Sequence, residues 1–224
     1  MSLFLKAKHW QLFLLLFALP IFLFMIGIAM FFANLDFQVL AESEPSPELI
    51  IDLFSNMSWI FAPMIVVFII QYCWYWSVAI GLKRFLPEGL AINSTLFKVC
   101  FFVSLIYISS FVLLSFGFSQ FLKSIFDSSI DGSIQPNFVI GRSIAAFSMI
   151  FPLHLFSTFS MFYIIYHSAK TIKTVNAQKQ VTFSDFIEEF FLIWFFPIGI
   201  WFIQPKINAI FEGKQLEEDG VYNN

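Results

Sequence analysis

The clearest evidence for the fold class is the apolar run WQLFLLLFALPIFLFMIGIAMFFA, residues 10–33. It contains no charged side chain, and as a helix rising about 1.5 Å per residue it would be roughly 36 Å long, enough to cross the ~30 Å hydrocarbon core of a bilayer. Lys6 and Lys8 precede it, as in a signal peptide. However, the run is longer than the apolar region of such peptides, and Phe31-Phe32-Ala33 lacks the small residues of a cleavage site. The sequence therefore predicts a retained membrane helix.

The composition of the whole chain agrees with this interpretation. Of 224 residues, 59% are hydrophobic, 12% are charged and 34 residues are phenylalanine, and the mean hydropathy is +0.82. A water-soluble domain has about 25% charged residues and cannot hide so large an apolar fraction. These values exclude a soluble enzyme, a disordered chain and a nucleic-acid binder. The net charge of -3 is spread along the chain, so it predicts no polyanionic or polycationic partner.

Apolar runs recur along the chain and predict its architecture. The expected full spans are residues 10–33, 57–82, 99–119 and 143–168, and a fifth, shorter hydrophobic helix is expected at 186–203. Each run is solidly apolar, whereas a barrel strand would alternate, and an open sheet edge finds no hydrogen-bond partners in lipid. The sequence thus predicts an all-α fold, a polytopic helical membrane bundle that forms a single transmembrane domain over residues 1–224.

The positions of lysine and arginine predict the orientation, because basic residues accumulate in short cytoplasmic loops. With the N-terminus inside, the cytoplasmic flanks contain Lys6, Lys8, Lys83, Arg84, Lys98, Lys170, Lys173 and Lys179, and the outer flanks contain Lys123 and Arg142. We therefore expect a cytoplasmic N-terminus. In the first outer loop, Ser46-Pro47-Glu48 has the residues of a helix start, which indicates a short helix on the outer surface or an extension of the second span.

The fifth hydrophobic run has two interpretations. Thr182 and Asp185 form a capping-box start, but Glu188 and Glu189 follow at once, and the charge-free part is short for a span. Pro197 interrupts it further. The run is therefore either a thin, proline-kinked crossing that exports the C-terminus or a re-entrant or interfacial helix that keeps the C-terminus inside. The count of basic residues mildly favours the second interpretation.

The end of this run carries a resemblance. The block FFPIGIWFIQPKIN, residues 195–208, resembles the closing segment of a group of uncharacterised bacterial multi-pass membrane proteins, in which a proline-interrupted aromatic helix ends in a Gln-Pro-basic step. The resemblance is confined to this part of the chain. It implies a location in a bacterial inner membrane, and it implies no activity, because no function is assigned to that group.

His154 is the ionisable residue that lies deepest in an expected span. It is near the middle of the fourth span, where its side chain cannot reach either surface, and such a group is costly unless it is paired. Ser157 and Thr158 share its side of the helix, and Gln71 lies at a matching depth in the second span. We expect these residues to form an interhelical contact, with a polar pathway or a ligand site as the alternatives.

Two other groups of residues are candidate ligand sites. His9, Cys100 and His167 begin or end spans at one boundary and could bind a metal or a haem, but no CxxC, HExxH or i, i+4 ligand pair accompanies them. Trp74 and Trp76 lie deeper than an aromatic belt requires and leave room for an aromatic cage. We expect no metal and no cofactor.

The function predicted from these observations is non-enzymatic. The chain has no GxSxG motif and no phosphate-binding glycine loop. We expect a structural or accessory membrane subunit whose partners are the lipid bilayer and other membrane subunits or a second copy of the chain, with no nucleic acid. The alternative is a small transporter or channel with a polar pathway around Gln71 and His154.

Overall fold

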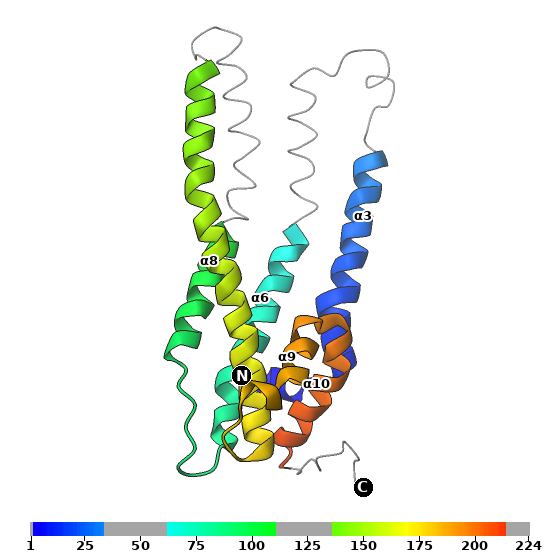
Figure 1. Ribbon diagram of the computed structural model, residues 1–224. Coiled ribbons are helices and arrows are strands. Elements are labelled where there is room, and N and C mark those ends of the chain that lie inside the picture. Colours follow the sequence, from blue (N-terminus) through cyan, green and yellow to red (C-terminus); the bar gives the residue numbers. More distant parts are fainter. Residues whose placement is uncertain (1, 34–61, 111–135, 214–224) are drawn as a thin grey trace. The chain divides into compact units, whose positions relative to one another are not determined.

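The computed structural model describes residues 2–33, 62–110 and 136–213, and all its elements in these ranges are helices (Figure 1). No strand occurs within them. The all-α prediction is therefore confirmed for this part of the chain. The helix expected to start at Ser46 and residues 111–119 of the third expected span lie outside the described residues.

The first expected span is a long helix with one irregular turn. A short helix α1 (Ser2–Lys6) precedes it, and the span itself consists of α2 (His9–Phe13), a π-helical turn η1 (Leu14–Ala18) and α3 (Leu19–Ala33). The π-helical turn comes directly before Pro20, which lacks an N–H and whose ring would clash with a carbonyl group in a regular α-helix. Because the N–H of Leu19 bonds to the carbonyl oxygen of Leu14 in this wider turn, the helix continues through the proline.

The second expected span also contains a π-helical turn. It consists of α6 (Ala62–Trp76), the π-helical turn η2 (Ser77–Gly81) and the 3-10 turn η3 (Leu82–Phe85). The hydroxyl of Ser77 donates to the carbonyl oxygen of Cys73 (2.8 Å), a local bond that is common for serine in apolar helices. A loop then leads to the helix Thr95–Ser110. Asn93 caps this helix, because its side-chain oxygen accepts a hydrogen bond from the N–H of Thr95 (2.9 Å).

The fourth expected span lies within α8 (Pro136–Ala177), which is longer than predicted. The predicted span ends at residue 168, after which lysines begin to interrupt the apolar run. The helix continues to Ala177 because buried residues recur along one face, namely Ala169, Ile172 and Val175. It ends at Gln178, whose positive φ of 52° is the left-handed conformation that terminates many helices.

Two helices in the described ranges are long and apolar enough to cross a membrane, His9–Ala33 and Ile65–Phe85, whereas Thr95–Ser110 is apolar but shorter. In the most apolar part of the first helix, only 17% of the residues are buried. A helix that is apolar on all sides and mostly uncovered suits lipid better than water. These two helices support a membrane location, and the four full spans stay a prediction.

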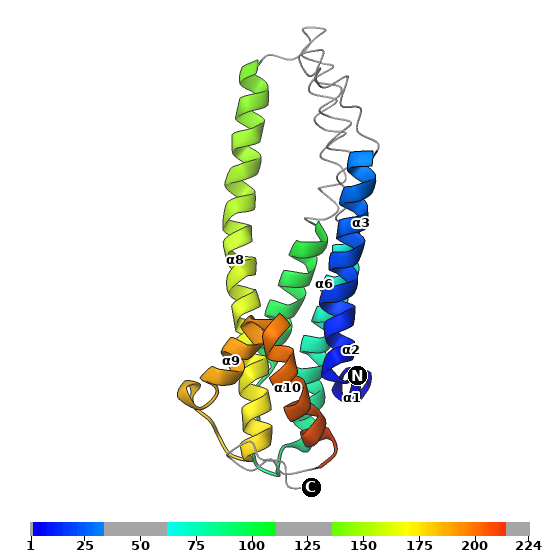
Figure 2. The same cartoon turned by 90° about the vertical axis from the view of Figure 1, so that its right-hand side faces the viewer.

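The fifth hydrophobic run is predicted as one helix at 186–203, either a kinked crossing or a re-entrant or interfacial segment, and the structure shows two helices that form a hairpin. The 3-10 turn η4 (Phe183–Asp185) leads into α9 (Ile187–Trp194), the chain turns at Phe195 (φ -89°, ψ 52°), and α10 (Phe196–Phe211) runs back beside α9 (Figure 2). Pro197 therefore stands in the first turn of a new helix, where its missing N–H costs no hydrogen bond, and it does not kink a continuous helix.

Two local features shape this hairpin. Gly199 lets its helices approach each other, because an ideally placed Cβ at this position would lie 1.7 Å from the carbonyl oxygen of Leu192. The predicted capping box is confirmed: the N–H and the hydroxyl of Thr182 donate to Asp185 Oδ2 (2.6 and 2.8 Å). The backbone bond first, and then the hydroxyl bond, lowers the pKa of Asp185 below its ordinary value of 3.8.

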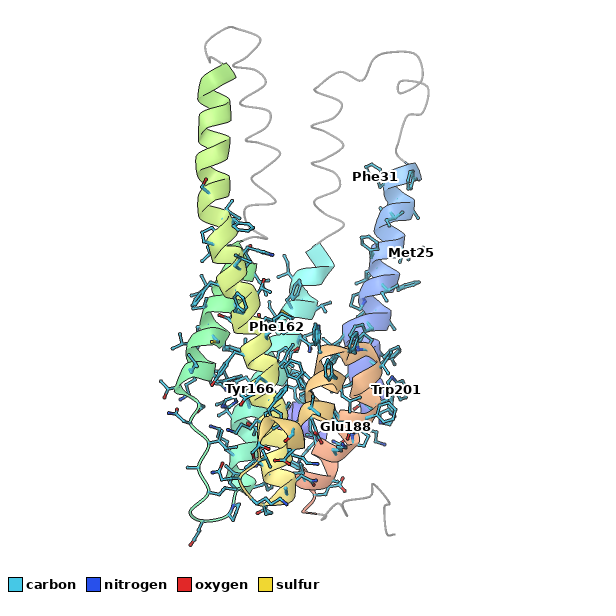
Figure 3. The ribbon with its side chains drawn as sticks, in the orientation of Figure 1. Met25, Phe31, Phe162, Tyr166, Glu188 and Trp201 are labelled. Carbon is cyan, nitrogen blue, oxygen red and sulfur yellow. The ribbon has the colours of Figure 1, made fainter. Side chains whose placement is uncertain are left out.

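Residue contacts divide the chain into two compact units. Unit 1 contains Met1–Leu19, Val67–Ser104 and Thr158–Asn224, and unit 2 contains Pro20–Val66 and Leu105–Ser157. Large side chains such as Trp74, Phe97 and Ile200 are fully buried in unit 1. In unit 2, large apolar side chains are exposed, among them Met25, which points away from α3 (Figure 3). The prediction of a single transmembrane domain stays a prediction.

Candidate functional site

His154 is hydrogen-bonded to Tyr107, a residue for which the sequence analysis predicts no role. The Tyr107 Oη and His154 Nδ1 atoms are 2.7 Å apart, and the two ring centroids are 5.7 Å apart. Both residues belong to unit 2, Tyr107 on the helix Thr95–Ser110 and His154 on α8. When the imidazole is neutral with its proton on Nε2, the phenol donates to Nδ1. The structure thus gives the imidazole a phenol on another helix as a partner.

The other residues of the predicted cluster are distributed over both units. Gln71 is hydrogen-bonded to Tyr75, one turn farther along α6. Gln71 and Thr158 belong to unit 1, and His154 and Ser157 belong to unit 2. On α8, Ser157 is buried and Thr158 is exposed. The contact between Gln71 and His154 stays a prediction.

A buried glutamine that the sequence analysis did not single out, Gln204 of α10, joins three segments of unit 1. Its Oε1 accepts a hydrogen bond from the indole N–H of Trp74 (3.0 Å), and its Nε2 donates to the carbonyl oxygens of Phe4 (2.9 Å) and Ala7 (2.8 Å). Both Gln204 and Trp74 have an exposed fraction of 0%. The amide offers two donors and one acceptor oxygen, so both amide N–H groups and the oxygen have matching partners.

Asn208, one turn after Gln204, adds to the same contact. Its Nδ2 donates to the carbonyl oxygens of Leu5 (2.8 Å) and Ala7 (3.2 Å). The last carbonyl groups of a helix have no partner within the helix, and here the side-chain amides of α10 supply it for α1. We call the set of Trp74, Gln204 and Asn208 the amide clamp. It holds α1, α6 and α10 together.

Lys206 lies between the two amides in sequence and joins α10 to α9. Its ammonium is 3.1 Å from Glu188 Oε1 and 3.2 Å from Glu189 Oε1. Glu188 is exposed, whereas Glu189 is buried. Burial by itself lowers the pKa of Lys206, but the two carboxylates together outweigh this effect and raise the pKa above its ordinary value of 10.5. The ion pairs therefore stabilise the base of the hairpin.

The histidines proposed as metal ligands pack against aromatic rings. The His167 ring stacks on Phe97 with centroids 4.8 Å apart, and its Nε2–H donates to the carbonyl oxygen of Asn93 (3.1 Å). The His9 ring lies 4.7 Å from that of Trp201. Within residues 2–33, 62–110 and 136–213, no group of three or more His, Cys, Asp or Glu side chains could hold a metal ion. The geometry therefore adds no support to a metal at His9, Cys100 and His167.

The hypothesis of an aromatic cage around Trp74 and Trp76 is wrong for Trp74. Its ring is fully buried, meets the ring of Phe196 edge to face at 4.8 Å, and its N–H is bonded to Gln204. Trp76 packs against Phe101 at 4.9 Å. Trp74 is therefore a core residue with no face left for a ligand, because the hairpin covers it.

One signal for the amide clamp was present in the sequence. Gln204 and Asn208 are polar residues four positions apart in an apolar helix, so they share one face. Apart from the indole of Trp74, the partners of that face are backbone carbonyl groups near the N-terminus, and a backbone carbonyl leaves no mark in a sequence. No family model matches the chain, and no curated protein and no solved structure matches it.

Proposed function

We propose that the chain is an integral, multi-pass protein of the bacterial inner membrane with a cytoplasmic N-terminus, and that it serves there as a non-enzymatic structural or accessory subunit. The two helices that are long and apolar enough to cross a bilayer support the membrane location. The distribution of lysine and arginine supports the orientation. The resemblance of residues 195–208 to bacterial multi-pass proteins supports the inner membrane.

The observation that carries the structural role is the amide clamp. In unit 1 the amides of Gln204 and Asn208 bond to other segments of the same chain, so these polar groups hold the fold together. Large apolar side chains are exposed, for example Phe22 (61%) and Met30 (61%) on α3. A helix face of this kind packs against acyl chains or against the helices of another subunit.

The test is the size of the particle that contains the chain in a mild detergent. We expect the tagged chain, expressed at its natural level, to migrate in a complex clearly larger than one 26.0 kDa chain with its micelle. A harsh detergent that dissociates membrane subunits is the matched control and should release the single chain. A single chain in both detergents would contradict the subunit role, and recovery of the chain from a detergent-free soluble fraction would contradict the membrane location.

A second candidate function is favoured by the pair of His154 and Tyr107. The imidazole and the phenol, joined by a hydrogen bond of 2.7 Å, place two polar groups from different helices side by side, as the lining of a polar pathway would. In this alternative the chain is a small transporter or channel, and Gln71, His154, Ser157 and Thr158 are the lining residues.

Proteoliposomes with a pH-sensitive dye inside distinguish the two functions. A pathway predicts a proton flux that both His154→Leu and Tyr107→Phe reduce, the latter by removing only the hydroxyl group. A structural contact predicts no flux from the parent chain. Each variant then loses about 0.6–2 kcal/mol of stability, and the double variant loses no more than either single variant. Absence of flux together with unchanged stability would contradict both roles of this pair.

A further inference from the structure

The contacts of α10 show how deep the hairpin lies along the first helices of unit 1. At one end, Gln204 and Asn208 bond to carbonyl groups of residues 4–7. Farther along, the ring of Trp201 lies 4.7 Å from His9 and 5.5 Å from Phe13. At the other end, the ring of Phe196 lies 5.9 Å from that of Phe17. α10 therefore runs antiparallel to residues 4–17, and the turn of the hairpin is level with Phe17.

This level is too shallow for a crossing. The first helix that can span the membrane begins at His9, and Phe17 follows about two turns later, roughly 12 Å along the axis. α9 has 8 residues and is also about 12 Å long. Both lengths are less than half of the ~30 Å hydrocarbon core. A hairpin of this length would reach only part of the way through one leaflet before the chain turns back.

The base of the hairpin is charged. The ion pairs of Lys206 with Glu188 and Glu189 lie there. In the last turn of α10, the ring of Phe211 is approached by two cations, with Lys6 Nζ 5.3 Å and Arg84 Cζ 4.8 Å from its centroid. Lys6 and Arg84 belong to the basic flanks that predict the cytoplasmic side. The end of α10 therefore lies beside the residues that indicate the inner boundary.

The turn of the hairpin is apolar and uncovered. Residues 190–205 carry no charge, and Trp194, Phe195, Ile198 and Phe202 have exposed fractions of 46%, 59%, 67% and 57%. Figure 3 marks Trp201, whose ring faces His9 and Phe13, and Glu188 nearer the base of the hairpin. Exposing so many large apolar side chains to water is unfavourable, and contact with acyl chains removes this cost.

We infer that α9 and α10 form a re-entrant hairpin whose turn inserts among the acyl chains of the leaflet in which the first span begins, so that both ends of the chain lie on one side of the membrane. The partner of the turn is the lipid of that leaflet. We assign lipid as this partner because the base of the hairpin is charged and because α10 runs antiparallel beside the start of the first span. The inference rests on the proposed membrane location and adds the path of the last helices.

Spin labels measure the depth of the turn. One label is attached at Ile198→Cys and a matched control label at Glu188→Cys, both in a Cys73→Ala, Cys100→Ala background reconstituted into phosphatidylethanolamine and phosphatidylglycerol vesicles. We expect the label at position 198 to be relaxed by oxygen and protected from a water-soluble nickel complex, and the label at position 188 to behave in the opposite way. Equal nickel accessibility at both positions would overturn the inference. Protection of position 198 from both reagents would show a protein neighbour and would also overturn it.

A labelling experiment on the two chain ends does not need the Cys73→Ala and Cys100→Ala substitutions. Ser2→Cys and Gly220→Cys are introduced into the chain with its own thiols, and intact cells are treated with a membrane-impermeant maleimide, with the parent chain as the blank. We expect neither position to react until the membrane is opened. Reaction of position 220 alone in intact cells would show a crossing and overturn the hairpin while leaving the membrane location intact. A chain removed from membranes by alkaline carbonate would overturn the proposed membrane location as well.

Discussion

Replacement of Gln204 with leucine should destabilise unit 1 by about 2–4 kcal/mol. The change removes the acceptor for the indole N–H of Trp74 and the donor for the carbonyl oxygens of Phe4 and Ala7. Asn208 still donates to Ala7, so two groups lose their partner, the indole N–H and the Phe4 carbonyl. A buried group without a partner costs about 1–3 kcal/mol, and the partly buried Phe4 contributes the smaller share.

A double-mutant cycle with Trp74→Phe isolates the bond between the two side chains. Without the indole N–H, Gln204→Leu leaves one unpaired group fewer, so its cost should be about 1–3 kcal/mol smaller than in the parent chain. Unfolding in mixed micelles is followed by far-ultraviolet circular dichroism, since a fluorescence readout would change with the tryptophan. Ile198→Leu is the matched control, because this exposed position of α10 should change stability by less than about 0.5 kcal/mol.

Two results would refute this reasoning. If Gln204→Leu lost no more stability than Ile198→Leu, the three bonds of the amide would not hold the segments of unit 1 together. If the two substitutions of the cycle were additive, the bond between Trp74 and Gln204 would contribute nothing, whatever the cost of each substitution alone.

Two further predictions concern the hairpin. Gly199→Ala should prevent the native packing of α9 on α10, because the new Cβ would lie 1.7 Å from the carbonyl oxygen of Leu192. Gly81→Ala is the control, because its Cβ meets only the flexible end of Leu5 at 3.2 Å. Melting curves should show a loss of the cooperative transition for Gly199→Ala and a shift of a few degrees for Gly81→Ala. The raised pKa of Lys206 contributes stability that is complete below pH 10.5 and is lost as the pH rises through the folded-state pKa. The melting temperature of the parent chain should therefore fall more steeply above pH 10.5 than that of Lys206→Met. Equal slopes for the two chains would contradict the ion pairs.

The helices of this protein could be predicted because their signals are local. The apolar run at residues 10–33 appears as a helix long enough to cross a membrane. The capping box of Thr182 and Asp185 involves residues three positions apart, and the interruption of the helix near Pro197 and Gly199 is a property of those residues themselves. The residues alone left a kinked crossing and a re-entrant segment as alternatives, because a kink and a reversal begin with the same proline.

The candidate site could not be predicted in the same way, because its bonds join distant residues. Gln204 and Phe4 are 200 positions apart, and Gln204 and Trp74 are 130 positions apart. For His154, the position within its expected span predicts Gln71 as a partner, but several helices offer a residue at any one depth. The structure shows Tyr107, which is 47 positions from His154, at hydrogen-bond distance.

The residue pattern alone predicts that the described chain is helical, where several of its helices begin, and which segments suit lipid. The packed fold was needed to show which faces meet, that the last apolar run turns back on itself, and that its two amides bond to the start of the chain. Lipid is about as apolar as the contacts inside a helix bundle, so the hydrophobic pattern of such a chain does not distinguish an inner face from an outer one. Buried polar groups make that distinction, and their partners are set by how the helices pack.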